Sequence, residues 1–84
     1  MRTIYKYPLT QPEIEMPAGA KVLSVGAIGE EIFVWADVDT KAAPVKRWFI
    51  IIGTGWNIDV PLQQFIGTVI FPNQLVFHVF ETKE

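Results

Sequence analysis

The sequence of 84 residues contains no cysteine and a single histidine. The absence of cysteine excludes disulfide bridges, thiolate metal ligands and cysteine nucleophiles at once. With one histidine, a zinc site would depend almost entirely on carboxylate ligands, which is not the usual composition of such a site. We therefore expect neither a metal nor a cofactor, and a chain of this size must be stabilised by its core or by a partner subunit.

Long apolar runs and charged residues are also scarce. No stretch reaches the roughly 18 uninterrupted apolar residues that span a bilayer, and residues 1–8 lack the apolar segment of an export signal, so we expect an intracellular protein. A net charge of −2 gives no electrostatic reason to expect nucleic acid or an anionic membrane as a partner. Because 50% of the residues are hydrophobic and 19% are charged, the chain is expected to fold as a single domain over residues 1–84.

The few charges are unevenly placed: only Asp59 lies between Trp48 and Phe80. A typical domain uses about 25% charged residues to coat the solvent side of its elements, so this half of the chain has too little polar material to face water alone. Either its strands are covered on both faces within the chain, or they form a subunit interface. We expect a homo-oligomer, most simply a dimer, formed through these uncharged C-terminal strands.

Glycine and proline, six of each, punctuate the sequence at short intervals that leave no room for a long helix. The segments between them are rich in β-branched and aromatic residues or alternate between apolar and polar positions. Strands are predicted over residues 3–7, 13–16, 21–28, 32–39, 46–52, 66–71 and 75–81, the first at a sheet edge and the fifth at a sheet centre. Residues 59–65 fit a single helical turn with Asp59 as its N-cap. The predicted class is all-β, with six or seven mainly antiparallel strands in a compact sandwich or partly open barrel.

Two turns predict hairpins. Gly29 and Glu30 stand where a two-residue turn would join strands, and Pro72 and Asn73 suit the centre of a type I turn. In residues 32–39, the alternation of a strand assigns one set of side chains to the core and the other set to the opposite face. The core set is Ile32, Val34, Ala36 and Val38, and the opposite set is Phe33, Trp35, Asp37 and Asp39.

Asp37 and Asp39 share a strand face and are close enough to bind a hard cation such as Mg²⁺ or Mn²⁺. The sequence identifies no third oxygen ligand, so we favour a solvated strand end. In that case the carboxylates are expected to pair with Lys46 or Arg47 across the hairpin.

Gly53-Thr54-Gly55-Trp56-Asn57 is the most site-like segment, because two glycines let the backbone turn sharply and approach a ligand. It lacks the third glycine of a dinucleotide fingerprint and the lysine of a P-loop, so it does not indicate a nucleotide cofactor. A turn after a buried strand would also explain it. If the segment contacts a ligand or partner, Thr54, Trp56 and Asn57 are the residues that would do so.

Trp48 and His78 complete the candidate binding residues. Trp48 follows the basic residues Lys46-Arg47. A surface that binds single-stranded nucleic acid needs basic residues interleaved with aromatic ones, and this is the one place where the sequence approaches that pattern. A single such pair does not make a binding surface. The aromatic residues within strands are therefore expected to form core or subunit contacts. His78 alternates with Val76 and Phe80, and a catalytic role would need a carboxylate or nucleophile that the fold brings to it. The alternative is a half-buried ring that is hydrogen bonded to a neighbour.

Residues 3–9, 14–25, 35–39, 49–55, 66–68 and 76–81 together cover nearly the whole chain. In their order and spacing they resemble a family of small, uncharacterised phage and prophage proteins. Family members often carry a histidine after the Gly-Thr-Gly of residues 53–55, where this sequence has Trp56, so a shared site at this loop would not depend on imidazole. The family supplies no catalytic residues.

The resemblance implies a small phage-encoded protein in a bacterial host cytoplasm, where such accessory proteins bind and block a host or defence component. Our leading hypothesis is a self-associating, non-catalytic binding protein, such as an inhibitor that occludes a CRISPR effector. The alternative is a sponge that sequesters a signalling nucleotide in a pocket between subunits, lined by residues 53–57. A third hypothesis is a hydrolase that uses His78 with Asp37 or Asp39.

Overall fold

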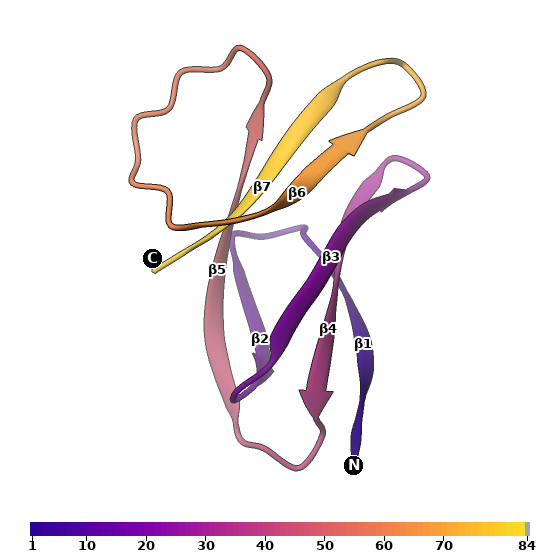
Figure 1. Cartoon of the computed structure of the whole chain (residues 1–84), viewed down its shortest axis with the longest axis vertical. Helices are drawn as coiled ribbons and strands as arrows, with labels where there is room; N and C mark the ends of the chain where they lie inside the picture. The colour runs from indigo at the N-terminus through magenta and orange to yellow at the C-terminus, as the bar shows by residue number, and fades with distance from the viewer. Residues whose placement is uncertain (84) are drawn as a thin grey trace.

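The computed structural model describes residues 1–83, in which seven β-strands are joined by short connections (Figure 1). The prediction of an all-β fold is confirmed, and within these residues there is no helix of the length and apolarity required to cross a membrane. The strands are β1 (Arg2–Pro8), β2 (Glu13–Pro17), β3 (Lys21–Ile28), β4 (Glu31–Asp39), β5 (Pro44–Gly53), β6 (Gln64–Ile70) and β7 (Val76–Thr82).

The strands form two antiparallel sheets that pack against each other without closing into a barrel. Sheet A has the order β1-β4-β3 and sheet B the order β2-β5-β7-β6, so β1 is an edge strand and β5 a central strand, as predicted. The two sheets meet where β3 passes β6 (Figure 1). There a Cβ atom on Gly67 would lie 2.7 Å from Cγ1 of Val25, so only glycine permits this approach.

The core lies between the sheets and follows the predicted alternation of β4. Val34, Ala36 and Val38 are at most 1% exposed. Sheet B contributes Met16, Phe49, Val69 and Val79 to the same cluster. Phe49 is the one aromatic residue of this buried cluster, whereas Trp35 lies on the opposite face of sheet A, against the backbone of Gly26.

Both predicted hairpins are present. Ile28 pairs with Glu31 around Gly29 and Glu30, and the positive φ of Gly29 (62°) at the first turn position is typical of a type II′ turn. The second loop is one residue longer than a two-residue turn: Gln74 N donates to Phe71 O at 2.9 Å, and Gln74 itself has a φ of 70°. This is the type I turn plus left-handed residue of a three-residue hairpin loop.

The helical turn predicted at residues 59–65 is absent. Residues 54–63 form an irregular loop, and Gln64 already pairs with Glu81 of β7. A single turn forms too few hydrogen bonds to offset the cost of helix nucleation, whereas Gln64 and Phe65 gain ladder bonds by extending β6.

The predicted partners of Asp37 and Asp39 are wrong, because β1 and not β5 lies beside β4. Arg2 Nε donates to Oδ1 and Oδ2 of Asp37 at 2.8 and 3.0 Å. This hydrogen bond with the Arg2 guanidinium is the main reason that the pKa of Asp37 is lowered. Asp39 Oδ1 accepts the backbone N–H of Lys41 at 3.0 Å.

Arg47 instead forms a half-buried ion pair with Glu81 on the core side of sheet B. Their side chains are 20% and 16% exposed, and Arg47 Nη2 donates to Glu81 Oε1 at 2.9 Å. Arg47 Nη1 also donates to the carbonyl of Ala20 at 2.7 Å, which ties sheet B to the turn before β3. The hydrogen bond with Glu81 raises the pKa of Arg47.

Candidate functional site

The face of sheet B opposite the core, called here the outer face, is exposed to solvent along β6 and half-buried along β5 and β7. Alternation and strand register assign its residues, since cross-strand partners share a face. Phe65 and Ile70 are 55% and 70% exposed, whereas Val69 and Val79 on the core face are 3% and 0% exposed. The outer face is formed by Trp48, Ile50, Ile52, Phe65, Thr68, Ile70, Val76, His78 and Phe80, of which Ile52 is only 8% exposed.

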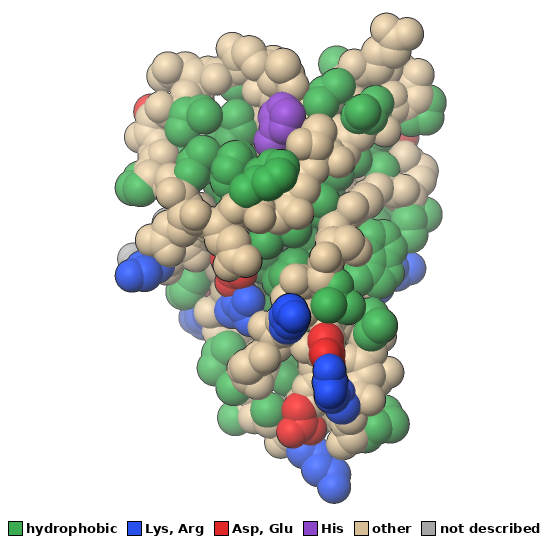
Figure 2. Space-filling view, viewed as in Figure 1, with side chains coloured by type: hydrophobic (Ala, Val, Ile, Leu, Met, Phe, Trp, Pro, Cys, Tyr) green, Lys and Arg blue, Asp and Glu red, His purple; other side chains and the backbone are tan. Residues whose placement is uncertain are grey.

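Apolar side chains dominate this face. Phe65 and Phe80 lie with their ring centroids 5.3 Å apart. The charged residues of the face, including the ion pair between Lys46 and Glu13 at 3.2 Å, lie at the β2 end of the sheet. Figure 2 shows the histidine among hydrophobic side chains, with most charged side chains of that view in the lower half of the molecule. One sheet face is thus covered by the core, whereas the outer face is exposed along β6 and partly covered over β5, where Ile52 is buried.

His78 forms the polar centre of the outer face. Its Nε2 lies 2.7 Å from Thr54 Oγ1, and its Nδ1 lies 3.0 Å from Thr68 Oγ1. A neutral imidazole has one N–H, so it donates to one threonine and accepts from the other. Thr54 is held in place because its backbone N–H donates to Val76 O at 3.0 Å.

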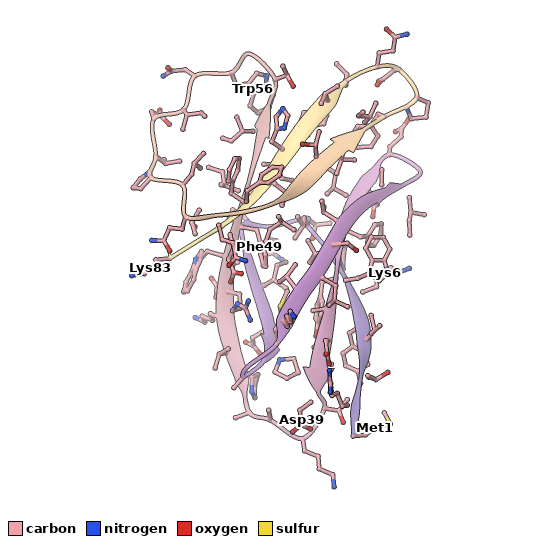
Figure 3. All side chains as sticks on the ribbon, in the orientation of Figure 1. Met1, Lys6, Asp39, Phe49, Trp56 and Lys83 are labelled. Carbon is pink, nitrogen blue, oxygen red and sulfur yellow. The ribbon has the colours of Figure 1, made fainter. Side chains whose placement is uncertain are left out.

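Thr54 and His78 have the spacing of a nucleophile and its base, but the second ring nitrogen meets a neutral hydroxyl where a triad has a carboxylate. The carboxylate of Asp37 is engaged by Arg2 in the other sheet. Asp39 lies at the opposite end of the molecule from Trp56 (Figure 3). The structure therefore brings neither aspartate to His78.

Trp56 lies three residues after the end of β5 and packs on the core side of sheet B, where Gly53 and Phe77 lie. Its indole packs on Gly53, where a Cβ atom would meet Nε1 at 2.6 Å, and its ring is 5.9 Å from that of Phe77 in an edge-to-face arrangement. Gly55 has a φ of 88°, which allows the turn. Trp56 remains 60% exposed and is on the other side of the sheet from the Thr54–His78 pair.

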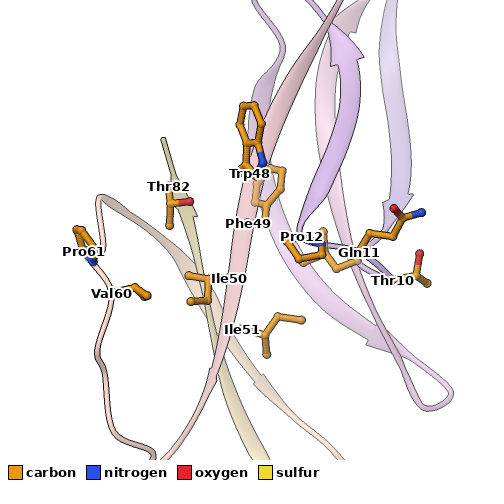
Figure 4. A pocket seen from close by; sticks show the side chains of 11 residues that line it. Thr10, Gln11, Pro12, Trp48, Phe49, Ile50, Ile51, Val60, Pro61 and Thr82 are labelled. Atoms are coloured by element: carbon orange, nitrogen blue, oxygen red, sulfur yellow. The ribbon is translucent and has the colours of Figure 1, made fainter. Parts of the chain in front are cut away.

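Trp48 lines a cleft of about 400 Å³ at the edge of β5. The loop residues Val60 and Pro61 form one side of this cleft, and residues 9–12 form the other (Figure 4). Asn57 is exposed in the loop, and none of residues 53–57 lines the cleft. Of the candidate residues, the structure thus joins Thr54 and His78 but separates Trp48, Trp56 and Asn57 from them.

Within residues 1–83 no group of three or more histidine and acidic side chains is placed to hold a metal ion. Comparison with known families is decisive for the relationship of the chain: the model described as "Domain of unknown function (DUF7352)" matches residues 1–84. The chain belongs to the DUF7352 family. No curated protein and no solved structure matches it significantly.

For this DUF7352 chain, the sequence did not identify Phe65 and Ile70 as the exposed apolar residues of the outer face, whereas Phe80 was expected to form core or subunit contacts. Phe65 was assigned to a helical turn, so its cross-strand contact with Phe80 was not foreseen. Thr68 and Ile70 alternate with Val69, which is buried in the core. This alternation was the signal that could have placed Thr68 and Ile70 on the outer face.

Proposed function

We propose that the protein is a non-catalytic binding protein and that the outer face of sheet B is its binding surface, with a second copy of the chain as the first partner. One observation carries this proposal: Phe65 and Ile70 of the outer face are 55% and 70% exposed, although Val69 of the same strand is buried in the core. Exposed contiguous apolar surfaces of this kind mark interaction sites on soluble proteins.

The surface has the composition of an interface core rather than of a catalytic site. Aromatic residues such as Phe65 and Phe80 are enriched at the centre of interfaces, and charged residues are depleted there. His78 adds a polar centre whose ring nitrogens are both within hydrogen-bond distance of threonine hydroxyls, so it can be buried without leaving an unpaired group. In a dimer with a two-fold axis, the outer face of one chain would pack against the outer face of the second chain.

The test is sedimentation velocity over a wide range of micromolar concentrations. We expect the wild type to dimerise and Ile70→Glu to sediment as a monomer, because the substitution places a charge at the most exposed position of the outer face. Ile4→Glu is the matched control, since Ile4 is 59% exposed on β1, the edge strand of sheet A, and faces away from the core. A monomeric wild type, or equal effects of the two substitutions, would contradict the proposal.

The biological setting of this binding activity is proposed from sequence resemblance alone. We place the chain among phage or prophage accessory proteins that act in a bacterial host cytoplasm by occluding a host defence protein. Plaque formation by a defence-sensitive phage on cells that express the chain tests this setting. We expect expression to restore plaques, and Ile70→Glu to abolish that effect at equal protein levels.

Sequestration of a signalling nucleotide remains an alternative prediction. The cleft at β5 is lined by no cationic side chain, so phosphate groups would have to be held by backbone amides or by the partner subunit. A thermal-shift panel of cyclic dinucleotides tests it. A shift that Trp48→Ala abolishes would indicate binding in this cleft, whereas a shift that Trp56→Ala abolishes would indicate the predicted pocket between subunits at residues 53–57.

A further inference from the structure

The edge of β5 is unpaired beyond the end of β2. The β2–β5 ladder covers Pro44 to Trp48, and its last backbone bond is from Phe49 N to Pro12 O at 2.8 Å. Successive residues of a strand direct their backbone groups to alternate sides, so the N–H and C=O of Ile51 point to the same side as those of Phe49. Within residues 1–83, no backbone group pairs with Ile51 on that side.

The chain leaves this edge because residues 9–12 turn away toward sheet A. Leu9 N donates to Ile32 O at 2.9 Å, which holds the segment beside β4. The space left next to Ile51 is the cleft of about 400 Å³. In Figure 4, Ile50, Val60 and Pro61 lie on one side of β5, and Gln11 and Pro12 lie on the other.

A second cleft of about 330 Å³ adjoins the first and shares Leu9, Thr10 and Ile51 with it. It lies between the sheets, where Phe71 and Phe77 form the apolar floor, with their ring centroids 5.5 Å apart. Glu30 and Glu31 line it from the β3–β4 turn, are exposed, and form no ion pair within residues 1–83. The groove therefore combines a free strand edge, apolar walls on both sides and an acidic rim.

We propose that the β5 edge at Ile51 accepts an extended segment of a partner protein, with apolar residues at alternate positions and one lysine or arginine that reaches Glu30 and Glu31. The Ile51 N–H and C=O would pair with the backbone of the segment as an added strand. Alternate side chains of a strand point to opposite faces, which matches clefts on the two sides of the edge. The cleft shares Trp48 and Ile50 with the outer face but is lined by neither Phe65 nor Ile70, and its occupancy does not require dimerisation.

The segment is identified by selection of random displayed heptapeptides on the folded full-length chain. We expect the enriched sequences to alternate apolar residues and to carry a basic residue. Synthetic copies of the strongest binder are then titrated into ¹⁵N-labelled protein, where hydrogen exchange of the Ile51 amide should slow as the peptide saturates. Methylating the peptide nitrogens one at a time should weaken binding about tenfold at the nitrogen that pairs with Ile51 O.

Two sets of variants separate backbone pairing from simple apolar contact. Ile51→Pro removes the unpaired N–H and also shortens a side chain that packs against the core, and it should weaken the peptide about tenfold. Ile51→Val, the matched control, also shortens that side chain but keeps the N–H and should not weaken the peptide. Glu30→Lys with Glu31→Lys should reverse the selection from basic to acidic peptides. If Ile51→Pro does not fold, the methylation series on the wild type decides the question.

The proposal is overturned if selection enriches no sequence, if enriched peptides are acidic or lack alternation, or if no methylated nitrogen weakens binding. It is also overturned if Ile51 becomes protected with rising protein concentration in the absence of peptide, because the occupant would then be a second copy of the chain. Binding that persists in the monomeric Ile70→Glu variant supports this site independently of the outer face.

Discussion

Phe65 on β6 and Phe80 on β7 are cross-strand partners whose ring centroids lie 5.3 Å apart on the outer face of sheet B. Phe65 is 55% exposed, whereas Val69 of the same strand is 3% exposed in the core. An aromatic pair of this geometry contributes about 0.5–1.5 kcal/mol beyond burial, and burying it against a partner would add more. This exposed pair is the centre of the proposed interface.

The ion pair between Arg47 and Glu81 predicts a strong effect on stability. Arg47→Met leaves Glu81 half-buried without its partner and removes the hydrogen bond to Ala20 O, so we expect a loss of about 2–4 kcal/mol in the free energy of unfolding. Urea denaturation measures it. Lys46→Met is the control, because its ion pair with Glu13 is exposed and should contribute at most about 1 kcal/mol. Equal losses in the two variants would refute this account.

The close approach of β3 and β6 predicts a compensating pair of substitutions. Gly67→Ala places a Cβ atom against Cγ1 of Val25 and should destabilise the protein by about 1–3 kcal/mol. In Val25→Ala the opposing methyl groups are absent, so adding Gly67→Ala to that variant should cost clearly less. A double-mutant cycle by thermal or urea unfolding gives the coupling. Additive effects would mean that the sheets do not touch at Gly67.

The contact of Arg2 with Asp37 predicts a pH dependence. The pKa of Asp37 is lowered in the folded state, so its contribution to stability is present above the ordinary carboxyl pKa and is lost as the pH falls through the folded value. Arg2→Gln should therefore reduce stability at neutral pH but not in strong acid. Carboxyl NMR titration should show the Asp37 midpoint return toward 3.8 in this variant. Lys6→Gln is the control, since Lys6 lies over Phe33 and should leave the midpoint unchanged.

The hydrogen bonds of His78 predict a modest structural role for Thr54. Thr54→Val leaves Nε2 without its partner at 2.7 Å and should cost about 0.5–1.5 kcal/mol in unfolding free energy. Long-range ¹⁵N spectra of the imidazole should show that Nε2 shifts more than Nδ1, which keeps its partner Thr68. If Nδ1 shifts more than Nε2, the assigned contacts are incorrect.

The sequence predicted the all-β class, both hairpins and the two faces of β4, because strand alternation and turn residues are local signals. Sheet order is not local: Arg2 and Asp37, which are 35 residues apart in the sequence, meet because β1 pairs with β4, a pairing that no pattern in either strand specifies. The scarcity of charged residues predicted that the C-terminal strands carry more apolar surface than the core of one chain can bury. It did not show which face is open, since that depends on where sheet A packs.

The site was predicted only in part, for the same physical reason. Thr54 and His78 were singled out separately, and their contact follows from the β5–β7 register. Trp56 was expected at a site because of its flanking glycines, but Gly53 instead offers its bare backbone as a packing surface for the indole. Side-chain preferences alone do not say whether a loop aromatic turns inward or outward.

The most direct test of the central claim is an isotope-filtered NOE experiment on a mixture of labelled and unlabelled chains. The account predicts intermolecular contacts between the methyl groups of Ile70 and the rings of Phe65 and Phe80, which Ile4→Glu retains. In Ile70→Glu, every intermolecular contact of the Phe65 and Phe80 rings should be lost. Intermolecular contacts confined to sheet A, or none at concentrations where the protein is dimeric, would contradict it.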